Sequence, residues 1–323
     1  MTNNPTIILH WYSFSPFAQK VRWALNFKKA EYKLVEIPIL EPRPERRPID
    51  GGYRKTPILQ IGNHTFCDSK AIFAELERRF PEPSFYPAGP QNEPTEAKVK
   101  SLARWLDSTF FMTVGSQVPV DVLDDAFLKD RQEFSGRPLE KQKLKFTAPY
   151  MRHTLKSEFE LLQTIVAEGS ENGKRWALGT DQLSLLDLHI AMNSWFISAL
   201  IGSEWIQKEF PLLAGHLQKT LAAVNFDDAD SRDKLVPEEA IEIAKKEKIE
   251  LVEAKHDGSL PIELGESVAV IPTDTGVIPS TGKLVHSTTS ETVIEHQDET
   301  HKSTVYIHFP VNGFVVIPLQ NKL

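Results

Sequence analysis

The first eighty residues alternate between short apolar runs and longer amphipathic stretches, which predicts a mixed α/β unit. Strands are expected at 7–10, 32–37, 58–61 and 64–67, and helices at 16–28 and 69–80. Gly62-Asn63 predicts a two-residue hairpin between the last two strands. The segment 38–48 holds too many prolines for a long regular element. The order βαβ, irregular segment, ββ and α indicates a thioredoxin-like arrangement.

Helical periodicity dominates the middle of the chain and predicts an all-α second part. Its helices are expected at 93–111, 120–134, 139–168, 185–200, 205–209, 211–224 and 237–248. Ser184 and Asp187 form a capping box at the start of one of these helices, with a structural role. The stretch 113–148 departs from a simple helix pair, and the sequence leaves open whether it is a lid or a dimer contact.

The chain changes character after about residue 260, where β-branched alternation replaces helical periodicity. Strands are expected at 267–271, 282–286, 292–296, 303–309 and 314–317, with a hairpin turn at Asn312-Gly313. These strands predict a small β-barrel or sandwich, tethered by a charged helix at 237–254. We therefore divide the chain into three domains, at 1–87, 88–257 and 258–323.

Composition narrows the possible functions. The chain has 323 residues and a net charge of −7, which argues against a nucleic-acid partner that needs a broad basic face. No apolar run approaches the roughly 18 residues of a membrane span. The N-terminus lacks the pattern of a secretory signal, so we expect a cytoplasmic protein. The single Cys67 excludes an intrachain disulfide and a Cys-x-x-Cys pair, and it is expected to be structural; we expect no metal site.

Three short motifs lie at the ends of the predicted strands of the first part. Ser15-Pro16 fits a helix start, with the serine at the N-cap, where an anion such as a thiolate would be stabilised. Thr56-Pro57 precedes a strand, and a cis peptide there would turn the Thr56 backbone toward a ligand. Asp68-Ser69 opens a helix whose N–H groups can hold a carboxylate. Each motif alone also allows a plain cap or turn.

Together, in this order, the motifs resemble the N-terminal domain of the glutathione transferase superfamily. Ser15 lies seven residues before Arg22, as the catalytic serine of the tau and zeta classes lies before the corresponding arginine; in the omega class a cysteine precedes the proline. The segment 55–59 is similar to the family's cis-proline segment, and Asp68-Ser69 is similar to the acid-serine pair that opens its third helix. The resemblance covers roughly the first 245 residues, and the β-rich tail departs from it.

The resemblance implies a glutathione-dependent transferase with Ser15 as the catalytic residue, donating a hydrogen bond to the glutathione thiolate. The implied glutathione-binding residues are Phe17, Lys55, Thr56, Pro57, Asp68 and Ser69. The implied pocket for a small hydrophobic electrophile is lined by Tyr12, Phe14, Trp105, Phe110 and Phe111, although such aromatics are more often core. Lys55 is chosen for the glycine end of glutathione from a cationic group that also holds Arg43, Arg46, Arg47 and Arg54, most of which are expected to be solvated. Glutathione is the expected co-substrate and a homodimer the expected assembly, with no metal, membrane or nucleic acid.

Three alternatives stay open from the sequence. The same thiolate would serve conjugation or a glutathione-assisted isomerisation. A non-catalytic binding or scaffold protein could keep the fold and use its β-rich tail as the binding surface. A specialised ligand other than glutathione is the third alternative, because the segment 41–54 departs from the family pattern at the glycine end.

Overall fold

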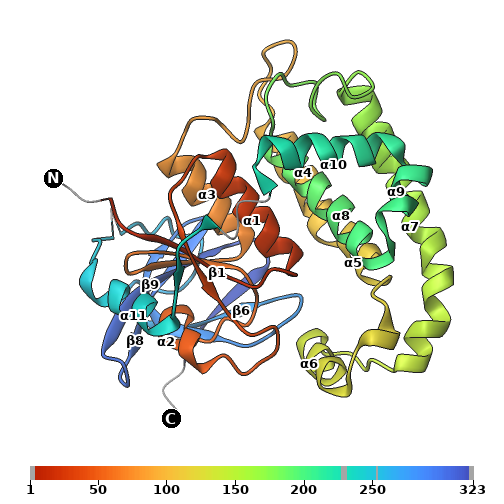
Figure 1. Cartoon of the computed structure of the whole chain (residues 1–323). Helices are drawn as coiled ribbons and strands as arrows, with labels where there is room; N and C mark the ends of the chain where they lie inside the picture. Colours follow the sequence, from red (N-terminus) through yellow and green to blue (C-terminus); the bar gives the residue numbers. More distant parts are fainter. Residues whose placement is uncertain (1–3, 227–230, 252–253, 320–323) are drawn as a thin grey trace.

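The computed structural model describes residues 4–226, 231–251 and 254–319. Strands from both ends of the chain lie on one side of the molecule and form a ten-stranded sheet, and the helices of the middle of the chain lie on the other (Figure 1). The strand order is β10-β6-β7-β8-β9-β4-β3-β1-β2-β5. Within the described ranges, no helix is both long and apolar enough to cross a membrane.

The N-terminal part has the predicted thioredoxin-like arrangement. Its elements are β1 (Ile7–Trp11), α1 (Pro16–Phe27), β2 (Lys33–Glu36), the 3₁₀ turn η1 (Pro44–Arg46), α2 (Arg47–Asp50), β3 (Ile58–Ile61), β4 (His64–Cys67) and α3 (Ser69–Arg79). β1 pairs in parallel with β2 and antiparallel with β3. β3 and β4 form the predicted hairpin about Gly62-Asn63, with Ile61 opposite His64. The proline-rich segment holds only the two short elements η1 and α2, as its composition predicts.

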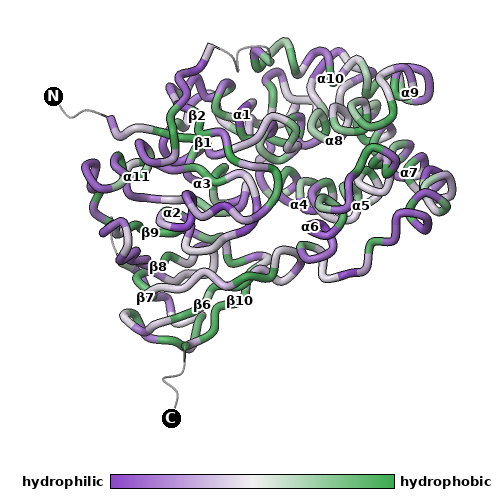
Figure 2. Tube along the Cα trace, turned by 60° about the horizontal axis from the view of Figure 1, so that its bottom comes forward, coloured by the Kyte–Doolittle hydropathy of each residue, from purple (hydrophilic) through white to green (hydrophobic). Residues whose placement is uncertain are grey.

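The five C-terminal strands lie close to their predicted positions. They are β6 (Ser267–Pro272), β7 (Ser280–Ser287), β8 (Glu291–Asp298), β9 (Ser303–Pro310) and β10 (Phe314–Pro318). They do not form a sheet of their own, because β9 pairs in parallel with β4 and continues the N-terminal sheet. The pairing satisfies the backbone groups that β4 would otherwise expose at a sheet edge. The expected separate barrel or sandwich is therefore a continuous extension of the first sheet, and stretches of hydrophobic residues are green near the β6 and β10 labels in Figure 2.

The expected hairpin at Asn312-Gly313 is wrong. The turn is present, with Phe314 N–H donating to the Val311 carbonyl, but it joins strands that do not pair with each other. β9 already has β8 on one edge and β4 on the other, so β10 crosses over and pairs with β6. One edge of β9 is occupied by the preceding strand β8 and the other by β4, which is distant in sequence, and the turn residues hold no information about this second partner.

A buried polar chain crosses the junction between β4 and β9. His64 Nδ1 lies 2.8 Å from His308 Nε2, and His308 Nδ1 lies 2.9 Å from Glu291 Oε1. His64 Nε2 faces the Ile249 carbonyl at 3.1 Å, so this nitrogen must hold the proton and donate it. His64 Nδ1 is then left as an acceptor. We infer a neutral His64 that accepts from His308, whose other ring nitrogen faces the Glu291 carboxylate.

The helical part follows the predicted order, with three differences. One of them is the expected helix at 120–134, which divides into a 3₁₀ turn at 120–122 and an α-helix that begins at Asp125. The helices of this part are α4 (Glu96–Asp107), α5 (Thr109–Gly115), the 3₁₀ turn η2 (Val120–Val122), α6 (Asp125–Ser135), α7 (Lys141–Gly169), α8 (Leu185–Ile201), α9 (Ser203–Glu209) and α10 (Pro211–Ala223). The expected helix at 93–111 breaks at Ser108, whose ψ of −97 is not helical. The tether is α11 (Pro237–Lys246), shorter than the expected 237–254, and residues 252–253 of that range lie outside the described residues. A two-residue strand, β5 (Lys234–Leu235), precedes it and extends the sheet beyond β2.

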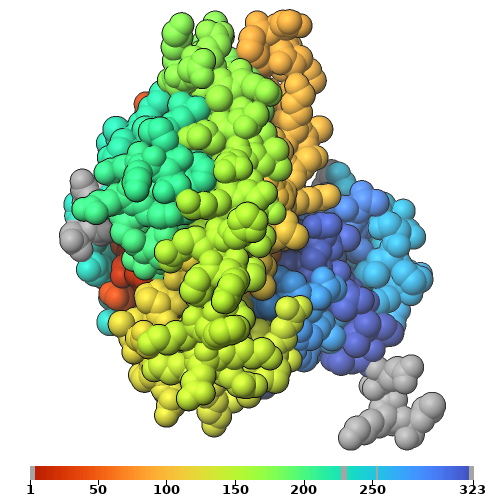
Figure 3. All heavy atoms as spheres, turned by 90° about the vertical axis from the view of Figure 1, so that its right-hand side faces the viewer, coloured from red at the N-terminus to blue at the C-terminus, as the bar shows by residue number. Residues whose placement is uncertain are grey.

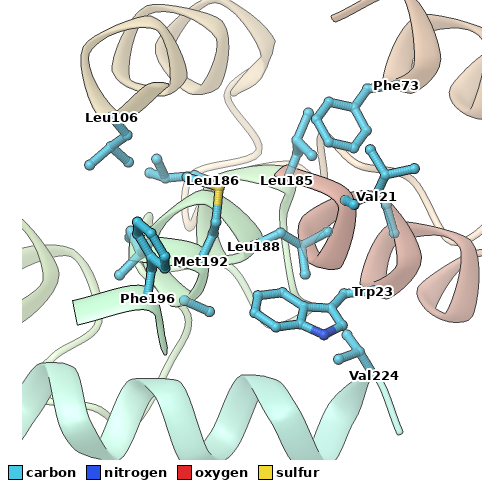
Figure 4. Close-up of a cluster of buried hydrophobic side chains, with 14 of the residues drawn as sticks. Val21, Trp23, Phe73, Leu106, Leu185, Leu186, Leu188, Met192, Phe196 and Val224 are labelled. Carbon is cyan, nitrogen blue, oxygen red and sulfur yellow. The ribbon is translucent and has the colours of Figure 1, made fainter. Parts of the chain in front are cut away.

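The central helix α8 fastens the helical part to the first sheet. Leu185 and Leu188 of α8 lie on the side of Val21 and Trp23 of α1 in one buried cluster (Figure 4). The predicted capping box is confirmed, because Ser184 N–H and O–H both donate to Asp187 Oδ2. Asp187 Oδ1 also accepts from Ala177 N–H and His216 Nε2. Burial alone would raise the pKa of Asp187, but these donors lower it, so the carboxylate is a structural anion.

An ionic cluster, Lys20-Asp107-His189, crosses the boundary between the two parts. The fully buried ammonium of Lys20 on α1 lies 2.6 Å from Asp107 Oδ1 at the end of α4. His189 Nδ1 of α8 lies 2.9 Å from the same carboxylate oxygen and 3.0 Å from Lys20 Nζ. Burial would raise the pKa of Asp107, but His189 and Lys20 hold it well below its usual range. The cluster therefore ties α1 to two helices of the second part through one carboxylate.

Asp107→Asn is predicted to lower the free energy of unfolding by about 3–5 kcal/mol, because it leaves the buried Lys20 ammonium without its counter-charge. Urea denaturation of the full chain at neutral pH measures the change. The matched control is Asp121→Asn, which removes the carboxylate of an exposed ion pair with Lys145. The control is expected to change stability by less than about 1 kcal/mol. Equal effects of the two substitutions would contradict the structural role of the cluster.

The stability of the fold is predicted to decrease as the pH falls below about 6.5, because burial lowers the pKa of both His10 and His64 to about 4. The unfolded chain then binds protons that the folded chain does not. Each histidine is expected to remove about 2 kcal/mol of stability at about pH 5 relative to neutral pH. Urea midpoints measured across this range test the effect. His10→Asn and His64→Asn should each flatten the pH dependence, and an unchanged slope would refute it.

Candidate functional site

The three predicted motifs lie in turns at the same end of three neighbouring strands. In the pairing of β1, β3 and β4, His10 lies opposite Ile58, and Ile58 lies opposite Cys67. The chain leaves β1 just after His10, enters β3 just before Ile58 and leaves β4 just after Cys67. The turns that hold Ser15, Thr56 and Asp68 are consequently neighbours at the end of three adjacent strands.

Ser15 caps α1, as its sequence predicts. Its Oγ accepts from Ala18 N–H at 3.3 Å, and Pro16 occupies the first helical position. Ser15 N–H donates to the Tyr12 carbonyl at 3.0 Å, which fixes the turn before the helix. The side chain is 3% exposed. Because the hydroxyl oxygen accepts the capping bond, its hydrogen is available for a ligand anion at the positive end of the helix dipole.

Thr56 is held by two arginines that the sequence analysis expected to be solvated. The Thr56–Pro57 peptide bond is cis. Arg43 and Arg46 donate to Thr56 Oγ1 from 3.3 and 3.2 Å, and both arginines are buried. Arg43 also donates to the Arg54 and Ile39 carbonyls, and Arg46 pairs with the buried Asp50. These arginines order the backbone around the turn, and no feature of the sequence other than their abundance between prolines indicated this role.

Asp68 and Ser69 open α3, as predicted. Asp68 is the N-cap and accepts from Lys70 N–H at 2.9 Å, and its carboxylate lies 3.1 Å from Lys70 Nζ. Its φ of 75 and ψ of 140 form a conformation that non-glycine residues rarely adopt, at a cost of about 1–3 kcal/mol. Ser69 is buried at the first helical position. A strained residue beside a helix N-terminus supports a binding role for this pair.

Aromatic side chains form an apolar wall between the turn before α1 and the helices α5 and α8. Phe14 is 51% exposed and lies against Trp195 and Phe196, with ring centroids 6.4 and 6.0 Å away. Phe111 stacks on Phe196 and contacts the edge of Phe17 at 4.8 Å. The sequence analysis missed Trp195 and Phe196, because both lie in a helix whose continuous hydrophobicity predicted only core.

The remaining expected pocket residues are Phe110, Trp105 and Tyr12. Phe110 is 0% exposed and packs between Trp105 and Phe159, so it belongs to the core and not to a pocket. The Trp105 indole donates to Glu158 on α7. Tyr12 packs against a separate cluster that contains Ile37 and Ile49. The expectation is wrong for Phe110, which is fully buried, and it stays a prediction for the half-buried Trp105 and Tyr12. The apolar wall retains Phe14 and Phe111.

Lys55 and Arg54 connect the site to distant parts of the chain. Lys55 pairs with Asp274 on the loop between β6 and β7. Arg54 pairs with Asp130 on α6, and both side chains are buried. Gly276 N–H donates to the Phe134 carbonyl at 2.7 Å, which joins the same loop to α6. Figure 3 shows the α6 region in contact with the C-terminal strands on the surface.

No group of three or more histidine, cysteine or acidic side chains is arranged to hold a metal ion in the ranges the structure describes. Cys67 is buried in the second hydrophobic cluster, and burial raises its pKa well above that of a free thiol. The thiol is therefore structural, as its place in a strand predicts.

Comparison with known proteins identifies the N-terminal part. Residues 9–84 match the model of the glutathione S-transferase N-terminal domain, and residues 111–227 match a domain of unknown function. A probable glutathione S-transferase of Nicotiana tabacum is 28% identical over 145 residues, 39% of this chain and 60% of the relative. The probable maleylacetoacetate isomerase 1 of Drosophila melanogaster is 32% identical over 107 residues, 31% of this chain and 42% of the relative. The matches span between 36% and 60% of the curated relatives' lengths.

Solved structures extend the likeness to the whole chain. A GST-like protein from Pseudomonas syringae is 27% identical, covers 96% of this chain and 99% of its own, and has a TM-score of 0.70. The tau class glutathione S-transferase of mango, Mangifera indica, is 18% identical, with 74% and 97% coverage and a TM-score of 0.50, and this likeness concerns the fold alone. The domain match covers the N-terminal part, and the whole-chain likeness is to a protein described by the same family term. The N-terminal part therefore matches the glutathione S-transferase N-terminal domain, and the whole chain is similar in fold to a GST-like protein, with a C-terminal run of strands joined to its sheet.

Proposed function

We propose that the protein binds glutathione and activates its thiol for attack on a small hydrophobic electrophile. One observation supports this proposal above the others. The strand register brings the turns with Ser15, Thr56 and Asp68-Ser69 to the same end of three adjacent strands. An extended peptide could pair with the Thr56 backbone while its two ends reach the neighbouring turns. The fold alone would leave the function open. Three polar turns at the same strand ends suit a short peptide with a thiol in its middle.

In the proposed complex, Ser15 donates its hydroxyl hydrogen to the glutathione sulfur. The hydrogen bond and the N-terminus of α1 both favour the thiolate, so the thiol loses its proton at a lower pH than in water. The N-terminal N–H groups of α3 and the Ser69 hydroxyl hold the γ-glutamyl carboxylate. Asp68 pairs with the amino group of the same residue. Phe17, on the first turn of α1, lies beside the sulfur.

The apolar wall of Phe14, Phe111 and Phe196 would receive the electrophile. It stands over the turn that holds Ser15, so a ligand packed on it lies near the thiolate, and proximity contributes much of the rate. Isomerisation is the second candidate reaction, because a relative at 32% identity is described as a probable maleylacetoacetate isomerase. Both reactions use the same thiolate and differ in the electrophile. A homodimer remains part of the proposal.

Ser15→Ala is predicted to lower kcat/KM about 10- to 100-fold at neutral pH, which is the effect of removing one hydrogen bond to a charged group. Calorimetry should find glutathione affinity nearly unchanged, and the ultraviolet absorbance of the bound thiolate should show a raised thiol pKa. Initial rates with an aryl halide and with a cis-configured unsaturated diacid distinguish conjugation from isomerisation.

Ser101→Ala is the matched control, because it removes an exposed serine hydroxyl that donates only within α4. It should leave binding and turnover as they are in the parent protein. The proposal fails if glutathione does not bind to the parent chain, or if Ser15→Ala and Ser101→Ala have the same turnover.

A further inference from the structure

We propose that Asp274, on the loop between β6 and β7, determines which thiol peptide the site accepts. It disfavours a carboxylate at the ligand end beside Lys55, so the preferred ligand has an uncharged or cationic group there. The inference rests on the proposed function, because it concerns the same site. It assigns a specificity role to the C-terminal strands, which contribute none of the groups proposed to act on the thiol.

The positions of the motifs give the direction of the ligand. A peptide with its γ-glutamyl end at Asp68-Ser69 and its middle paired with Thr56 continues along the segment that leads into Thr56. Its far end then lies toward Lys55 and Arg54. For glutathione this end is a glycine carboxylate, an anion that would seek one of the nearby cations.

Each cation of that segment already has a partner within the chain. Arg43 donates to the Pro38, Ile39 and Arg54 carbonyls. Arg46 pairs with Asp50, and Arg47 lies against Glu41 and Asp50. Arg54 pairs with Asp130 across the boundary to α6. A ligand carboxylate would therefore have to share or displace an existing partner.

Lys55 is the cation closest in sequence to the cis peptide, and Asp274 already neutralises it. The Asp274 side chain is 64% exposed and that of Lys55 is 17% exposed, so a carboxylate approaching the ammonium from solvent meets Asp274. Two anions on one cation repel each other, and only one can be neutralised by it. An uncharged amide or ester end meets no such repulsion, and a cationic end would be attracted.

The loop is held where it is, so Asp274 does not simply move aside. Gly276, two residues later, donates to the Phe134 carbonyl of α6, and its Cα packs close to the Phe134 ring. Gly276 has a φ of +59, and a side chain there would meet that ring at 2.9 Å. The Arg54 guanidinium lies over the same ring, 5.4 Å from its centroid. These contacts fix the loop against the helical part next to Lys55.

Calorimetric titration of the full chain tests the inference with two ligands, glutathione and its glycine-carboxylate ethyl ester. The parent protein is expected to bind the ester at least as tightly as glutathione. Asp274→Asn should tighten glutathione binding about 3- to 10-fold and change the ester's affinity by less than about 2-fold, because only the former has the repelled charge. The gain should shrink at high salt. Glu299→Gln, which removes an exposed carboxylate in the turn between β8 and β9, is the matched control and should change neither affinity.

The possible failures can be told apart. A parent protein that binds glutathione more tightly than the ester, with no gain in Asp274→Asn, would overturn this inference and leave the proposed function intact. An equal gain in Glu299→Gln would overturn it as well, because the effect would then be one of net charge. If neither ligand binds to any of the three proteins, the proposed function fails and the inference fails with it. Circular dichroism of the variants verifies that each is folded.

Discussion

The candidate site depends on the pairing of β1, β3 and β4. The register that sets His10, Ile58 and Cys67 side by side also brings together three turns that lie far apart in the sequence. A slip of one residue in either pair would turn the buried faces of these strands outward, so the hydrophobic core fixes the register strongly. The geometry of the site is thus a consequence of core packing, and the polar residues occupy positions that the apolar ones determine.

Buried charges then fix the surroundings of that edge. Lys20 and Asp107 join α1 to α4, Arg46 and Asp50 order the segment before Thr56, and Arg54 and Asp130 attach α6. Removing such groups from water costs free energy that their attraction only partly offsets, so they contribute little net stability. Their partners are nevertheless specific, because an ion left alone in the interior is very costly. These buried ion pairs therefore define one arrangement of the helical part around the strand ends that hold Ser15, Thr56 and Asp68.

The C-terminal strands are an integral part of this protein. β9 pairs with β4 along the edge of the first sheet, and the hydrogen-bonded chain Glu291-His308-His64 crosses that junction. Excising residues 258–323 would expose the backbone groups of β4 and leave His64 without its donor. A separate binding module attached by a linker would show neither feature. The contact between Lys55 and Asp274 extends this dependence to the candidate site itself.

The local elements and the site motifs followed from the sequence. Alternation and helical periodicity predicted nine of the strands and most helices, since burial of an apolar face sets both periods. Ser15, Thr56 and Asp68 were found because caps and turns are local and their residue types reflect them. Only the tertiary structure decided which strand pairs with β10, where Phe110 and Tyr12 pack, and which carboxylate neutralises Lys55. These outcomes depend on contacts between residues separated by tens to hundreds of positions, and no local pattern determines which of many compatible partners arrives there.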